Sequence, residues 1–153
     1  MSRHTIAAFL LILQGIQLAF LLLHDWISLG RLTNLPAVHA ADSRARLFWT
    51  TILSALPFAA VFIASCIYFP HPHWPMWLRM SLWYTYGFAL LGAILAWWWP
   101  YLGPPNPERT ARYTVRFAGT HRFLPERNGI APDTLHVLFH ATILATLILL
   151  ALL

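Results

Sequence analysis

Four long apolar segments, each with very few charged residues, dominate the sequence. They cover residues 5–27, 47–69, 78–100 and 133–153. An α-helix needs about 20 apolar residues to cross the ~30 Å hydrocarbon layer of a membrane. The pattern therefore predicts an all-α membrane protein, in which residues 1–153 form a single domain folded as an antiparallel bundle of four transmembrane helices.

The connection between the second and third segments is short and alternates proline with His71 and His73. Proline in this density forbids a helix, so the two segments are predicted to form a tight hairpin. Two histidines this close resemble a metal pair, but we expect a solvated turn. The neighbouring Trp74 and Trp77 are typical of the membrane interface.

The first and third loops, residues 28–46 and 101–132, are longer. In the first, Gly30, Asn34 and Pro36 predict turns, and Asp42 or Ser43 is the expected N-cap of the second span. In the third, Asn106 and Pro107 predict the start of a short helix. This helix carries three arginines on one face, namely Arg109, Arg112 and Arg116. We expect it to lie on the membrane as an interfacial amphipathic helix, with its arginines reaching lipid phosphates.

Two features modify the second and third spans. Pro57 predicts a kink in the second span, where Ser54 is placed to bond the backbone carbonyl that the proline leaves free. The third span ends in a run of tryptophans, Trp97 to Trp99. An aromatic belt in the headgroup region is the expected role of this run.

Composition and charge agree with a membrane location. Apolar residues make up 59% of the chain and charged residues 10%, whereas a soluble domain carries roughly a quarter charged residues. Eight of the ten arginines lie in loops 28–46 and 101–132. This asymmetry predicts that both loops face the cytoplasm, with both termini outside, in what we expect to be a bacterial inner membrane. A cleaved secretory signal is the alternative for the first segment, but its apolar run is long and ends well before the cleavage-like Val38-His39-Ala40.

Missing residue types exclude several chemistries. The chain has no lysine, which excludes a Schiff base and the phosphate-binding lysine of a P-loop. Its lone Cys66 excludes an internal disulfide and a CxxC redox pair. Nothing in the sequence resembles a nucleic-acid-binding module, so the basic balance is assigned to orientation and anionic lipid rather than to nucleic acid.

The first span carries a polar stripe. At 100° per residue its polar side chains fall within an arc of about 100°. They are Gln14, Gln17, His24, Asp25 and Ser28, with Trp26 beside them. Because amides and carboxylates facing lipid are costly, the stripe is expected to face other helices or a cavity.

The last span carries a matching stripe of Asp133, His136 and His140 at positions i, i+3 and i+7. We expect the two stripes to face one another, with His121 from the third loop covering them. The predicted catalytic residues are His24, Asp25, His136 and His140, and a histidine paired with Asp25 is the expected general base. The predicted ligand-binding residues are Gln14, Gln17, His121 and Trp26.

Three interpretations of this polar cluster remain open: a structural hydrogen-bond network, an acid–base or ligand site without metal, and a metal site. The last would take zinc or iron from His24, His136 and His140, with Asp25 and His121 as further ligands. We expect no metal, and the sequence indicates no particular cofactor.

The functional hypothesis is a pocket at the cytoplasmic membrane face that binds or converts a lipid-like small molecule, such as an isoprenoid or quinone. Proton transfer suits its histidines better than nucleophilic hydrolysis, since no activated serine or cysteine is evident. The alternative is a non-catalytic accessory subunit of a larger membrane complex. Transport is a third hypothesis, for which four spans require a dimer. The sequence therefore leaves open whether the chain forms a homodimer or joins a larger complex.

Overall fold

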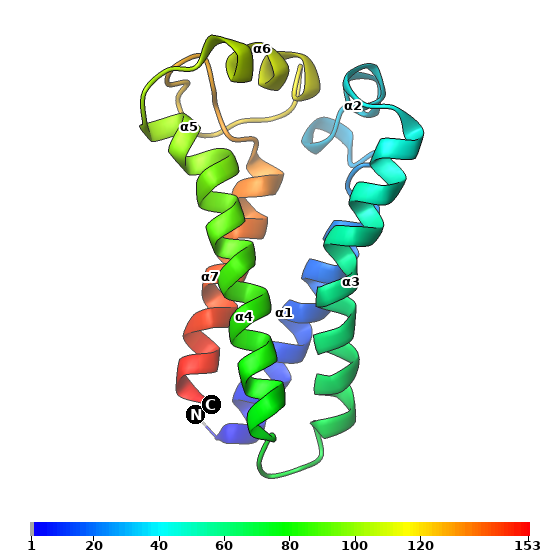
Figure 1. The fold of residues 1–153 in the computed structure, drawn as a ribbon, viewed down its shortest axis with the longest axis vertical. Helices are drawn as coiled ribbons and strands as arrows, with labels where there is room; N and C mark the ends of the chain where they lie inside the picture. The colour runs from blue at the N-terminus through cyan, green and yellow to red at the C-terminus, as the bar shows by residue number, and fades with distance from the viewer. Residues whose placement is uncertain (1) are drawn as a thin grey trace.

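The computed structural model describes residues 2–153, and these are helical with no β-strand (Figure 1). The elements in chain order are α1 (Arg3–Leu23), the 3₁₀ turn η1 (Gly30–Leu32), α2 (Leu35–Ala41), α3 (Arg44–Tyr68), α4 (Met76–Ala93), the π-helical turn η2 (Ile94–Trp98), α5 (Trp99–Leu102), α6 (Pro107–Arg116) and α7 (Thr134–Leu152). The predicted all-α class is confirmed.

Four of the helical stretches are long and apolar enough to cross a membrane. They are Arg3–Leu23, Arg44–Tyr68, Met76–Leu102 and Thr134–Leu152. The predicted spans match them closely, and the third continues without a break through η2 and α5. Helix α1 packs against α3 and α7, and α4 packs against the same two helices (Figure 1). Both termini lie at the end of the molecule opposite to α2 and α6.

The core between these helices is apolar and includes Leu10, Leu78, Leu82 and Ile143, all almost fully buried. Many other large apolar side chains point outward instead, as Leu53 does on α3 and Phe88 on α4, with 66% and 70% of their surface exposed. Apolar surface on this scale is unusual for a protein surrounded by water and is what a helix in lipid presents.

Side-chain caps fix where the helices begin. Ser43 caps α3 by accepting the N–H of Arg46, and Asn106 caps α6 by accepting the N–H of Arg109. The sequence left Asp42 and Ser43 as alternatives, and the structure selects Ser43. In the first loop the prediction of turns alone was wrong. Asn34 caps an additional helix, α2, with Pro36 in its first turn, a combination that favours a helix start as much as a turn.

The environment of Pro57 also differs from the prediction. The proline lies inside α3 as expected, and it leaves the carbonyl of Leu53 without its helical N–H. The hydroxyl of Ser54, however, donates to the carbonyls of Thr50 and Thr51, one turn earlier. A serine side chain in a helix reaches back toward the preceding turn, so it does not meet the carbonyl of its immediate neighbour.

The π-helical turn η2 has a local cause and a partner. Pro100 has no N–H to offer the carbonyl of Ala96, four residues earlier. The hydroxyl of Tyr113, on α6, donates to that carbonyl instead. Turns of this kind are rare and often occur at functional sites. Here the turn ties the end of the third long helix to α6.

Candidate functional site

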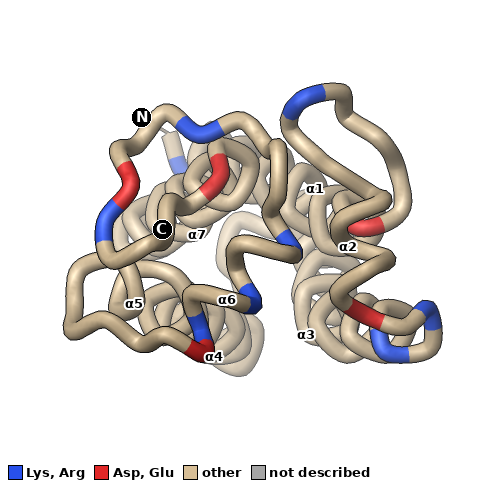
Figure 2. The backbone as a smooth tube through the Cα atoms, turned by 90° about the horizontal axis from the view of Figure 1, so that it is seen from above, with Lys and Arg blue, Asp and Glu red and all other residues tan. Residues whose placement is uncertain are grey.

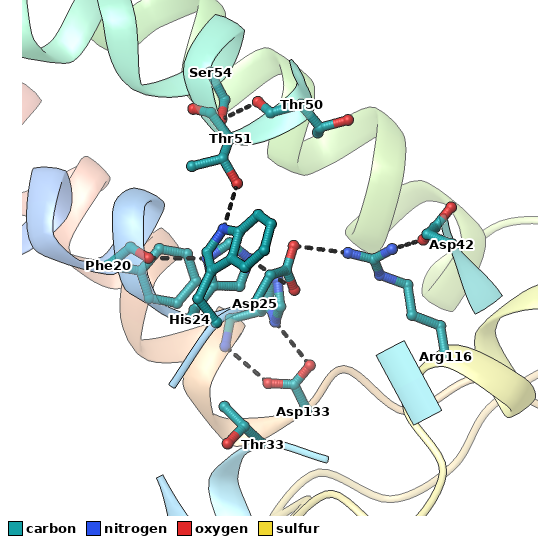
Figure 3. Close-up of polar contacts among 12 residues, drawn as sticks. Phe20, His24, Asp25, Thr33, Asp42, Thr50, Thr51, Ser54, Arg116 and Asp133 are labelled. Carbon is teal, nitrogen blue, oxygen red and sulfur yellow. Dashed lines mark hydrogen bonds and ion pairs between the residues drawn. The ribbon is translucent and has the colours of Figure 1, made fainter. Parts of the chain in front are cut away.

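Arg116 of α6 joins three parts of the fold. Its Nη2 atom donates to Oδ2 of Asp25, just beyond α1, at 2.9 Å, and its Nη1 atom pairs with Asp42, between α2 and α3 (Figure 3). Arg46 of α3 adds a second ion pair to Asp42 at 3.1 Å. Seen from above, α6 lies between the end of α4 and the charged residues near α2 (Figure 2). Arg116 was expected to reach lipid phosphates; the structure directs it to two carboxylates inside the protein.

Asp25 and His24 lie directly after the last residue of α1. The Asp25 side chain is largely buried, and His24 lies beside it with Nε2 3.4 Å from Oδ1. The other ring nitrogen of His24, Nδ1, bonds the carbonyl of Phe20 at 2.9 Å. Burial lowers the pKa of His24 below its ordinary value, and the charge of Asp25 offsets this only in part. His24 is therefore mostly neutral near pH 7. Because its Nδ1–H donates to Phe20, its Nε2 then carries no proton and forms no hydrogen bond with Asp25.

Trp26 has a structural partner. Its indole N–H donates to the hydroxyl of Thr51 on α3 at 3.0 Å (Figure 3). This bond joins the end of α1 to the first half of α3. Trp26 was predicted as a ligand-binding residue, and the structure places it in this helix-to-helix contact.

His136 is held by Asp133 through both carboxylate oxygens. Oδ2 bonds the ring at Nδ1 at 2.7 Å, and Oδ1 accepts the main-chain N–H of His136 at 3.0 Å as the cap of α7. Burial alone would raise the pKa of Asp133, but the hydrogen bonds and charge of His136 outweigh it and leave this pKa below its usual value. The ionised carboxylate holds the proton of the imidazole on Nδ1. Nε2 then remains as an acid–base atom.

Aromatic rings enclose His136. The ring of Trp97, from η2, lies 4.4 Å away between centroids, and the rings of Phe117 and His24 lie at 5.4 and 5.5 Å. Trp97 is only 7% exposed, so its predicted place in an interfacial belt was wrong, whereas Trp99 is exposed. Trp97 lies four residues after the buried Ala93 and continues the inward face of the third long helix, whereas Trp99, two residues later, lies about 200° further around the helix.

His136 also lies on the wall of an open cleft of about 940 Å³. Leu47 and Thr50 of α3 form one side, Ala96 and Trp97 of η2 the other, and α6 covers the top. The residues of α6 that line it include Arg109, Arg112, Tyr113, Val115, Arg116 and Phe117. The cleft thus has an aromatic and apolar floor and a basic roof.

The two glutamines of the polar stripe lie in the helix core. Gln17 donates to the hydroxyls of Thr142 and Thr146 on α7, at 3.2 and 3.0 Å, and Gln14 is fully buried. The stripe therefore faces α7 over this stretch. Farther along, Ser28 is exposed and departs from it. Neither glutamine lines the cleft. Gln17 joins α1 to α7 by its two hydrogen bonds, whereas the amide of Gln14 has no hydrogen-bond partner within residues 2–153.

His140 and His121 also differ in environment from His136. His140 is buried one turn along α7, and within residues 2–153 its Nδ1 atom has no hydrogen-bond partner. His121 is exposed and bonds the hydroxyl of Thr134 at 2.8 Å. Its main chain also joins Arg31 to Thr134. His121 thus fixes the loop at the start of α7.

The hypothetical metal ligands do not converge. Across the described part of the chain, no three His, Cys, Asp or Glu side chains are grouped so that they could hold an ion. The rings of His136 and His140 are 6.3 Å apart between centroids. In the hairpin turn, His73 bonds Arg3 at 3.0 Å through Nδ1.

Comparison of the chain with protein-family models, with curated proteins and with solved structures finds no match. The functional argument therefore depends on the geometry of the cleft and of the side chains around it. Sequence reasoning found His136 and Asp133 from their spacing. It missed Trp97 and Arg116 as parts of the site. The helical spacing from Tyr86 and Ala93 to Trp97 was the available signal for the first of these.

Proposed function

We propose that this chain is an integral membrane protein of a bacterial inner membrane, with its four long helices crossing the bilayer as an antiparallel bundle. The outward apolar side chains of these helices support this proposal. The loops that contain α2 and α6 carry most of the arginines and face the cytoplasm, and both termini lie outside.

Within this frame, the cleft beneath α6 binds a lipid-like small molecule. The observation that carries the proposal is the position of His136, which Asp133 holds at 2.7 Å and which lies on the cleft wall. A ligand site is commonly a concave, largely apolar surface with a few oriented polar groups. Trp97 and Leu47 supply the apolar surface here, and His136 supplies the oriented polar group.

The same geometry supports an acid–base role. His136 Nε2 accepts a proton from the bound molecule or returns one to it, while Asp133 keeps the ring in place and stabilises its charged form. This assigns the acid–base role to His136 instead of a histidine paired with Asp25. His24 is a contact of His136 rather than a residue of the cleft wall.

A cleft-filling variant tests the binding proposal. Ala96 lines the cleft, whereas the adjacent Leu95 is exposed and lies outside it. With the purified chain in nanodiscs and a diazirine-bearing farnesol as the probe, we expect Ala96→Trp to reduce photolabelling about tenfold. Leu95→Trp is the matched control and should label like the original protein. Equal labelling of both variants, with both folded, would contradict the proposal.

The accessory-subunit hypothesis also has a specific observation in its favour. The outward faces of α3 and α4 are apolar along their length, with Leu53, Leu56 and Ile63 exposed on α3, and the cleft is open rather than enclosed. Such a face suits a protein partner as well as lipid. Cysteine cross-linking in native membranes from Leu56→Cys and Ile63→Cys distinguishes the two hypotheses. Adducts to one defined protein favour the accessory role. No protein adduct at either position favours a face that contacts lipid, and with it the binding protein.

A further inference from the structure

The charge of the cleft is unbalanced. Its lining contains four arginines, Arg46, Arg109, Arg112 and Arg116, and two acidic residues, Asp42 and Glu108. The lining residues therefore carry two more positive than negative charges, and one more when Asp25, which pairs with Arg116 from outside the lining, is included.

Only half of these arginines have an acidic partner. Arg46 pairs with Asp42, and Arg116 is shared between Asp42 and Asp25. Over residues 2–153, Arg109 and Arg112 form no ion pair, although Glu108 is adjacent in sequence to one and four residues from the other. The side chain of Arg109 is half-buried. The positive charge on the cleft roof is thus not neutralised within the protein.

The two arginines are three residues apart on α6, a spacing that places their side chains on the same face of a helix. A guanidinium group binds phosphate through parallel N–H donors, and two of them on one face fit a dianionic or monoanionic phosphate group. Below them, Leu47, Ala96 and Trp97 offer an apolar surface to the rest of such a molecule. The polar and apolar halves of the cleft match those of a phosphate-bearing amphiphile.

We propose that the occupant of the cleft is an anionic lipid whose phosphate group binds Arg109 and Arg112. This inference rests on the proposed function and assigns the chemical class of its ligand. Arg46 and Arg116 keep the cleft in shape through their carboxylate partners, and Arg109 and Arg112 select the charge of the head group.

Native mass spectrometry of the detergent-solubilised chain tests the proposal, with dioleoyl phosphatidic acid as the probe and dioleoyl phosphatidylcholine as the neutral comparison. We expect a single phosphatidic acid per chain to bind in preference to phosphatidylcholine. The double variant Arg109→Gln/Arg112→Gln should weaken this binding about tenfold. Arg31→Gln/Arg44→Gln removes the same charge from the same end of the protein, outside the cleft, and should change it at most about twofold.

Equal losses in the two double variants would overturn the proposal, since they would indicate diffuse attraction between a basic surface and any anion. Displacement of phosphatidic acid by inorganic phosphate at low millimolar concentration would also overturn it, by showing that the lipid chain adds nothing. Melting temperatures of both variants show that each is folded. If farnesol labels the cleft but phosphatidic acid neither binds nor competes, the lipid class is wrong and the proposed function stands; if neither probe reaches the cleft, the proposed function fails.

Discussion

The carboxylate of Asp133 binds His136 twice, once at the imidazole Nδ1 at 2.7 Å and once at the main-chain N–H at 3.0 Å. One side chain therefore both begins α7 and orients the ring on the cleft wall. Helix N-caps usually perform only the first task. The position of the proposed acid–base atom, Nε2 of His136, is thus coupled to the integrity of α7.

The lowered pKa of Asp133 predicts a pH-dependent stability. A carboxyl group whose pKa is lower in the folded than in the unfolded state stabilises the fold above its unfolded pKa. That contribution is lost as the pH falls through the folded pKa. We expect Asp133→Asn to cost about 1–3 kcal/mol near pH 7 and progressively less below about pH 4. Thermal unfolding in detergent measures this, with the exposed Glu108→Gln as the control. A cost that is constant with pH would contradict the assignment.

Arg116 is predicted to hold α6 in place. Arg116→Gln leaves the buried carboxylates of Asp25 and Asp42 without their shared partner, at an expected cost of about 2–4 kcal/mol. Arg112→Gln, on the same helix but without an ion pair in the described chain, should cost at most about 0.5 kcal/mol. Hydrogen exchange of the α6 amides reports the effect directly. If α6 remains as protected in Arg116→Gln as in Arg112→Gln, the ion pairs do not anchor it.

The bond between Trp26 and Thr51 should be visible in a double-mutant cycle. Trp26→Phe and Thr51→Val each remove one partner of the 3.0 Å bond, and each should destabilise the protein by about 1 kcal/mol. The double variant should lose less than the sum, because the second change finds the bond already absent. Additive losses in urea or thermal unfolding would show that the two side chains do not interact.

The π-helical turn gives a prediction of rescue. Tyr113→Phe removes the hydroxyl that donates a hydrogen bond to the Ala96 carbonyl. We expect this change to destabilise the packing of α6 by about 1–2 kcal/mol. Pro100→Ala in the same background restores an N–H four residues beyond Ala96, so it should recover part of this loss. Hydrogen exchange of the α6 amides and the melting temperature both measure the loss and its recovery. A further loss on adding Pro100→Ala would contradict the explanation of the turn.

How well the sequence predicts a feature of this structure depends on how far apart in the chain the interacting residues lie. The four long helices follow from runs of apolar residues, and the link between Asp133 and His136 follows from a three-residue spacing within one helix. The partners of Arg116 lie 91 and 74 residues away from it, and the path of two loops decides where they meet. The burial of Trp97 does follow from helical periodicity, because Trp97 lies on the same face as Tyr86 and Ala93; the run of three tryptophans at a span end indicated the membrane interface instead.

The glutamines show a different limit. Their spacing correctly indicates an inward-facing stripe, but it does not distinguish a cavity wall from a helix contact. Thr142 and Thr146 decide this, because Gln17 donates to both hydroxyls. Threonine is so ordinary in an apolar helix that the pairing had no signal in the sequence.

The central claim is that the cleft beside His136 holds a lipid-like molecule, and site-specific photocross-linking tests it most directly. A benzophenone amino acid at Val115, on the cleft roof, is compared with the same residue at Leu144, which is equally exposed but lies on the outer surface of α7. We predict that Val115 captures one lipid-like species, that excess phosphatidic acid competes it away, and that Leu144 captures a mixture of bulk lipids. Identical adducts at the two positions, unaffected by competitor, would contradict the account.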